Sequence, residues 1–256
     1  MKEFVFEPRT YRNRIPGSDL VSFSVTVKET DLYIRSGKNL KNKATRIVEK
    51  YRGILEKYIA RRPAFTTALE PFSPEKTAPL IVQAMCSAAA QAGVGPMAAV
   101  AGAIAEYTGK ELLEYSDEVI VENGGDIFMK CLKKRTVSVY AGQSPLSEKL
   151  SIDIEPGDTP LGVCTSSGTI GHSLSFGNAD AVVVVSGSTL LADAAATSIG
   201  NIIKKPGDIR SGLDKMDTIP GIRGVLIIIG DQAGVRGDIQ LNRTDQEIPI
   251  TENERC

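Results

Sequence analysis

Residues 118–134, EVIVENGGDIFMKCLKK, place a glycine pair between two apolar stretches. Val and Ile before the glycines and Ile, Phe and Met after them are typical of β-strands. Gly124 and Gly125 let the backbone turn sharply, and they let a ligand or another strand approach closely. A tight turn or a bulge capped by Asp126 explains the same residues without any ligand.

The rest of the chain extends this pattern in both directions. Upstream, the alternation of apolar and polar residues at 20–36 predicts a hairpin. Apolar residues at helical spacing predict an amphipathic helix over residues 39–62, which ends at Pro63, and residues 73–115 predict two alanine-rich helices. Strand pairs that follow helices, without strict alternation, favour an α+β sandwich of mixed or antiparallel sheets over a doubly wound parallel fold. Downstream, one helix at 188–204 interrupts further predicted strands, at 136–142, 149–155, 181–187, 223–231 and 235–241.

Length and composition predict one domain over residues 1–256, with a loosely held tail from about residue 242. No apolar run approaches the roughly 20 residues of a membrane span, and the N-terminus lacks the apolar core of a secretory signal. We therefore expect a cytoplasmic protein without membrane contact. The cysteines, at positions 86, 131, 164 and 256, lack the close spacing of zinc sites or a disulfide framework, so reduced thiols are expected.

The charge balance indicates the class of partner. Thirty basic residues face thirty-one acidic ones, so nothing favours nucleic acid or a membrane surface. A small-molecule ligand is the better expectation, and oligomers remain open.

Residues 186–201, SGSTLLADAAATSIGN, set Asp193 and Thr197 four apart on a predicted helix, one turn from each other on the same face. A carboxylate and a hydroxyl so placed could supply oxygen ligands to Mg²⁺. The simpler alternative is a helix packed through its alanines, in which Thr197 bonds its own backbone and Asp193 is solvated or paired.

Residues 162–180, GVCTSSGTIGHSLSFGNAD, hold the single histidine, His172, among hydroxyls and glycines. Hydroxyls and glycine N–H groups are suited to phosphate oxygens or a polar cofactor edge, although plain turns share this composition. His172 could titrate in a cleft or serve a structural role. Cys164 could form a nucleophile and base pair with it, or be a small buried hydrophobe.

Together, the motifs at 121–128, 164–173 and 192–201 resemble, in order, those of the ApbE-like family, best known for Mg²⁺-dependent transferases that move FMN from FAD to a protein threonine. The resemblance covers roughly residues 63–205 and implies a T-fold-like α+β sandwich. It implies metal ligation by Asp193 and Thr197. The flavin or nucleotide contacts would come from the other two motifs, at Asn123, Gly124, Gly125, Asp126, Thr165, Ser166, Ser167, Gly168 and Thr169.

One element of the transferases is missing here. After Thr-Ser-Gly they carry His-x-x-Asp-Pro-x-Thr-Gly, whereas this chain reads GHSLSFGNADAVVVV, in which His172 could replace only the histidine. The transferases are also commonly exported lipoproteins. The chain is more similar to a shorter cytoplasmic ApbE-related subfamily, associated in methanogens with incorporating sulfide into homocysteine.

Three functions therefore stay open. The first is an ApbE-like enzyme, a transferase by resemblance, that binds FAD, FMN or a nucleotide with Mg²⁺. The second is a sulfur-handling protein that uses Cys164 and His172, with partner proteins, in making homocysteine from sulfide and an aspartate-derived aldehyde. The third is a binding protein of the same fold that has lost catalysis.

Overall fold

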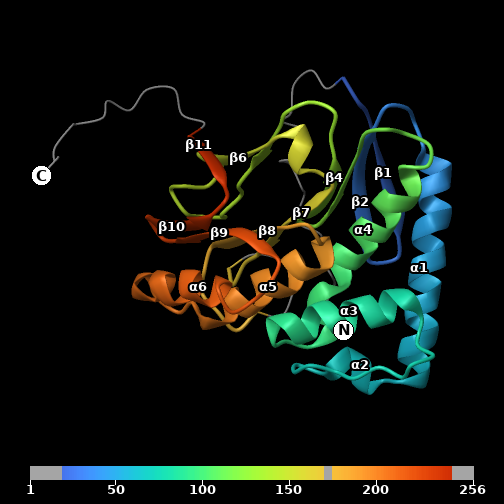
Figure 1. Cartoon of the computed structure of the whole chain (residues 1–256), viewed down its shortest axis with the longest axis horizontal. Helices are drawn as coiled ribbons and strands as arrows, with labels where there is room; N and C mark the ends of the chain where they lie inside the picture. The colour runs from blue at the N-terminus through green and yellow to red at the C-terminus, as the bar shows by residue number, and fades with distance from the viewer. Residues whose placement is uncertain (1–18, 170–174, 244–256) are drawn as a thin grey trace, which may run out of the picture.

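The computed structural model describes residues 19–169 and 175–243. The first half of the described chain is a hairpin followed by helices (Figure 1). Both features confirm the sequence predictions, including the break between the two alanine-rich helices. The elements are β1 (Val21–Val27), β2 (Thr30–Ser36), α1 (Lys41–Arg61), α2 (Ala64–Thr67), α3 (Leu80–Ala92), the 3₁₀ turn η2 (Pro96–Ala99) and α4 (Val100–Leu112).

The second half is rich in strands, as predicted, with two helices among them. The strand β7, the helix α6 and the short 3₁₀ turns escaped prediction. The elements are β3 (Val119–Asn123), β4 (Asp126–Lys130), β5 (Arg135–Ser138), β6 (Leu150–Ile154), η3 (Pro156–Asp158), β7 (Leu161–Ser166), β8 (Ala181–Ser186), α5 (Thr189–Ile202), η4 (Pro206–Asp208), α6 (Ile209–Met216), β9 (Ile222–Ile229), β10 (Gln232–Gly237) and β11 (Gln240–Arg243).

One prediction near the C-terminus was wrong. The single strand expected at 235–241 is divided, because Gly237 adopts a φ of 88° that turns the chain from one sheet into another. At the start of the tail expected from about residue 242, Asn242 and Arg243 still pair with Ser151 and Leu150 of β6, and the tail itself stays a prediction. Residues 244–256 lie outside the described part.

The described strands form two sheets whose pairs are all antiparallel. The large sheet has the order β1-β2-β3-β4-β7-β8-β9-β10, and the small one has the order β11-β6-β5. The α+β sandwich with antiparallel sheets is thereby confirmed.

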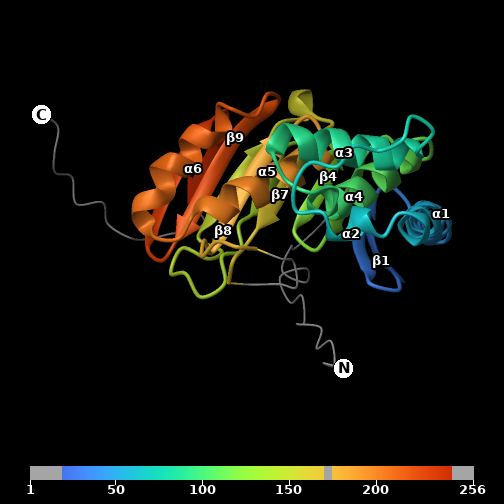
Figure 2. The same ribbon diagram turned by 90° about the horizontal axis from the view of Figure 1, so that it is seen from below.

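Helices cover one face of the large sheet, and the small sheet covers part of the other (Figures 1 and 2). Strand β8 shows how its sequence fits both layers. Val182 and Val184 belong to the core beneath the helices, whereas Val183 and Val185 pack with the small sheet. An unbroken apolar run is expected for a strand buried on both faces.

Within the two described ranges, no single helix is both long and apolar enough to cross a membrane. Residues 80–92 and 96–112 reach that length and composition only as a pair, bent by 105°.

Candidate functional site

The glycine pair forms the two-residue turn between β3 and β4. Gly124 and Gly125 have φ values of 69° and 104°, and Asn123 pairs with Asp126 across the strands. A tight hairpin turn with positive φ at both central positions favours glycine. The Asn123 amide donates to the carbonyl of Ala101 in α4, at 3.0 Å. The turn is therefore as the sequence predicted, and it is also tied to the helical layer.

Strand β7 brings the hydroxyl-rich segment beside this turn. A Cβ on Gly125 would lie 3.8 Å from the Cβ of Thr165. Next to Thr165, the fully buried Cys164 points into the helical layer, where its Sγ donates to the carbonyl of Thr189 at 3.4 Å. The first residue of α5 is thus in contact with β7.

Helix α5 carries Asp193 against the first turn of α4. The Gly102 N–H donates to Asp193 Oδ2 at 2.8 Å, and the Ala101 N–H also donates to this carboxyl. A Cβ on Gly102 would come within 2.5 Å of the Thr189 carbonyl, so the two helices approach at a distance that only glycine permits. Asp193 therefore satisfies one of the free N–H groups at the start of α4.

Two carboxyls, those of Asp126 and Asp193, influence each other in this buried region. Burial raises the pKa of Asp126 well above its usual range, and the charge of Asp193 raises it further. Burial also raises the pKa of Asp193 to about 7, against the opposing effect of the Gly102 and Ala101 N–H groups. Asp126 Oδ1 is buried without a hydrogen-bond partner. A proton or a cation at this point would relieve both effects.

The donor set suits Mg²⁺. No group of three or more His, Cys, Asp or Glu side chains that could hold a metal occurs in the described chain. Two carboxylates and the Thr197 hydroxyl, one turn beyond Asp193, supply oxygens only. Magnesium commonly takes one or two carboxylates and fills its other positions with water and phosphate oxygens.

Cys164 lies among these groups as a protonated thiol. Burial raises its pKa well above the usual value, and the charges of Asp126 and Asp193 raise it further. A nucleophilic role for Cys164 stays a prediction that this environment does not favour, because nucleophilic cysteines need a stabilised thiolate. Its suggested base, His172, lies outside the described residues.

The other predicted ligand residues divide into two groups. Ser166 lies beside α5, with its Oγ 3.5 Å from where a Cβ on Gly200 would be. Further along, Ser167 contacts Thr169, whose hydroxyl donates to Asp180 at 3.1 Å, and the Gly168 N–H donates to the Ala179 carbonyl at 2.8 Å. These contacts tie residues 167–169 to residues 179–180, and ligand binding by them stays a prediction.

Sequence reasoning missed the contribution of α4. Ala101 and Gly102 contact Asn123 and Asp193, yet the alanine-rich stretch indicated only close packing. Their backbone groups make these contacts, so no side-chain pattern could have identified them.

The comparisons with known proteins agree with this architecture. A family model described as "AbpE bacteria" matches residues 12–217. A UPF0280 protein of Methanococcus aeolicus is 41% identical over 91% of this chain and 96% of its own length. A second one, from Methanococcus maripaludis strain C5, is 43% identical over 87% of this chain and 93% of its own length.

Among solved structures, the apo form of the Pseudomonas stutzeri flavinyl transferase ApbE is similar, with a TM-score of 0.55. It is 14% identical, and the match covers 85% of this chain and 94% of that one. This likeness shows the fold, and the family model and the relatives show the family: the chain belongs to the ApbE-like family described as "AbpE bacteria", together with the UPF0280 proteins it matches.

Proposed function

We propose that this protein binds a flavin or a related phosphate-bearing nucleotide, FAD or FMN in the first instance, together with Mg²⁺. The observation that carries the proposal is the pair formed by the buried Asp126 and the half-buried Asp193, in which Asp126 Oδ1 has no partner. The flavinyl transferase with the same fold supports the flavin as ligand.

Each residue of the site would have its own role in binding. Asp193 Oδ1 and the Thr197 hydroxyl, with Asp126 opposite, would hold the cation, which supplies positive charge to phosphate oxygens when bound. Burial and the charge of Asp193 raise the pKa of Asp126, and a cation bound beside it would favour its charged form. Asn123 fixes the turn that carries Asp126 to α4. A transferase reaction at this site would add catalysis to the proposed binding.

Calorimetric titration with FAD, in Mg²⁺ and then in EDTA, tests the binding. We expect binding that needs Mg²⁺ and that Asp193→Asn weakens at least tenfold, because one charged ligand is lost. Asp214→Asn is the matched control, since Asp214 lies exposed on α6 and pairs with Arg236. Absence of FAD and FMN binding in both conditions would overturn the proposal. A protein that binds FAD but transfers no FMN would be the non-catalytic member of the family.

The sulfur-handling alternative depends on Cys164. Because Cys164 has 0% exposure, a sulfur donor could reach it only after the contact between β7 and α5 opens. Mass spectrometry of the native protein after exposure to a persulfide donor tests this. Added sulfur on Cys164 would support the role, whereas a Cys164→Ser protein that still supports growth on sulfide would count against it.

A further inference from the structure

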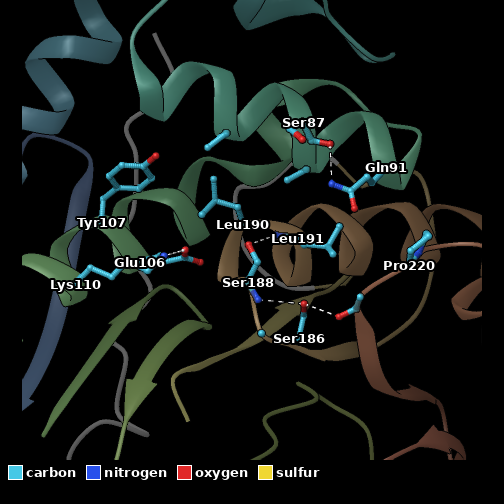
Figure 3. Close-up of a pocket in the computed structure, with 14 residues that line it drawn as sticks. Ser87, Gln91, Glu106, Tyr107, Lys110, Ser186, Ser188, Leu190, Leu191 and Pro220 are labelled. Atoms are coloured by element: carbon cyan, nitrogen blue, oxygen red, sulfur yellow. Dashed lines mark hydrogen bonds and ion pairs between the residues drawn. The ribbon is translucent and has the colours of Figure 1, made fainter. Parts of the chain in front are cut away.

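Glu106 of α4 is a buried carboxylate outside the pair described above. It is 5% exposed and forms part of the wall of an open pocket of about 510 Å³ between α3, α4, the start of α5 and residues 220–221 (Figure 3). The Thr189 N–H donates to Glu106 Oε2 at 2.6 Å, and Lys110 pairs with Oε1 at 2.6 Å. Glu106 is therefore fully engaged, and it binds α5 rather than solvent.

The Glu106 contact mirrors the Asp193 contact. Thr189 is the first residue of α5, so its N–H has no partner within that helix. Gly102 lies in the first turn of α4, and its N–H donates to Asp193. Each helix thus gives a free N-terminal amide to a carboxylate carried by the other helix, and both bonds are short. We call this arrangement the reciprocal cap.

The geometry of the reciprocal cap indicates a positioning role. A carboxylate at a helix N-terminus occupies the place that a bound anion would take. Two further N–H groups there are also satisfied, because the Ser188 hydroxyl accepts from Leu191 and the Ser186 hydroxyl accepts from Ser188 (Figure 3), whereas the buried Thr189 hydroxyl has no partner. The pocket itself offers no unpartnered buried group to a ligand, whereas the cap joins the two helices that carry the candidate metal site.

We infer that Glu106 is a positioning residue that sets α5 against α4, so that Asp193 and Thr197 stand opposite Asp126. The expected effect on cation binding rests on the proposed function, whereas the contact between the two helices does not. Without Glu106, α5 loses one of the two hydrogen bonds described above that join it to α4, and it keeps its local cap at Ser188 and the contacts of Thr189 with β7. The Gly102–Asp193 bond would then lengthen or break intermittently.

The test compares Glu106→Ala with Ser188→Ala. Both remove a cap from the start of α5, but only the first removes a link to α4, so Ser188→Ala controls for helix destabilisation. In metal-free protein, we expect Glu106→Ala to speed hydrogen exchange of the Gly102 amide at least tenfold, and to weaken Mg²⁺ binding in calorimetry at least tenfold. Ser188→Ala should change both by less than threefold. Glu106→Gln should restore most of both, since its amide oxygen can accept from Thr189.

The outcomes separate this inference from the proposed function. If the Gly102 amide of Glu106→Ala exchanges hydrogen at the wild-type rate, the inference is overturned, whatever the Mg²⁺ affinity of the variant. If wild-type protein binds no Mg²⁺, the proposed function fails, and the exchange rate of Gly102 still decides the helix contact. If Glu106→Ala does not fold, Thr189→Pro removes the donor instead, at a first helical position that proline tolerates, and the same exchange criterion applies.

Discussion

At the scale of single residues, the environment of a side chain decides its chemistry. Asp193 and Thr197 could be recognised in the sequence by their spacing, but the same spacing suits an ordinary packed helix. What distinguishes Asp193 is the N–H of Gly102 on one oxygen and the neighbouring Asp126. Both belong to segments more than 60 residues from Asp193 along the sequence, so no local sequence pattern indicates them.

The raised pKa values lead to a pH prediction. Because Asp193 has a pKa of about 7 in the folded protein and 3.8 as its ordinary value, the folded state binds more protons between these values. Its stability contribution is then fully present below pH 4 and is lost as the pH rises through 7. In EDTA, we expect the free energy of unfolding to fall from pH 5 to pH 7.5, by at most about 1.4 kcal/mol per pH unit for one group.

Urea denaturation across this pH range measures the decline. Asp193→Asn should make it less steep, because an amide does not titrate while Asp126 still does, and Mg²⁺ should reduce it in the wild type. Equal slopes in the variant and the wild type would show that other groups cause the decline.

At the scale of elements, the turn between β3 and β4 combines both interpretations of the glycine pair. The sequence predicted a tight turn and, through resemblance, a ligand site; the structure confirms the turn and places Asp126 beside Asp193. The strand β7 escaped prediction because its polar C-terminal half, Thr165 and Ser166, continues into a loop without a change of composition.

The two glycines should differ in what they tolerate. At a φ of 104°, Gly125→Ala should cost about 1–2 kcal/mol, because a left-handed conformation is unfavourable for residues with a Cβ. The Cβ itself has room, 3.8 Å from Thr165. Gly124→Asn, at a φ of 69°, should cost less than about 0.5 kcal/mol, since Asn accepts that region. Urea denaturation compares them, and equal costs would contradict this account of the turn.

At the scale of the whole molecule, the large sheet separates two cores. The candidate site lies between the sheet and the helices, whereas the small sheet packs on the opposite face. The fully buried Ile152 of β6 belongs to that second core.

Ile152→Ala should therefore destabilise the protein by about 2–5 kcal/mol through the cavity it leaves. It should leave the Mg²⁺ affinity of the folded protein unchanged. Thermal denaturation gives the first quantity, and calorimetry at a temperature where the variant is folded gives the second. A large loss of affinity would mean that the two faces are coupled through the sheet.

The sequence by itself determined most of the elements and the fold class. Hydrophobic alternation in residues 20–36, the helical period of residues 39–62 and the glycine pair each depend on local backbone preference, and local preference can be read from neighbouring residues. Only the tertiary structure decided which strand lies beside which, the reciprocal cap of α4 and α5, and the raised pKa values of Asp126 and Asp193. These depend on backbone groups and on burial contributed by distant segments, and such contributions exist only once the chain has folded.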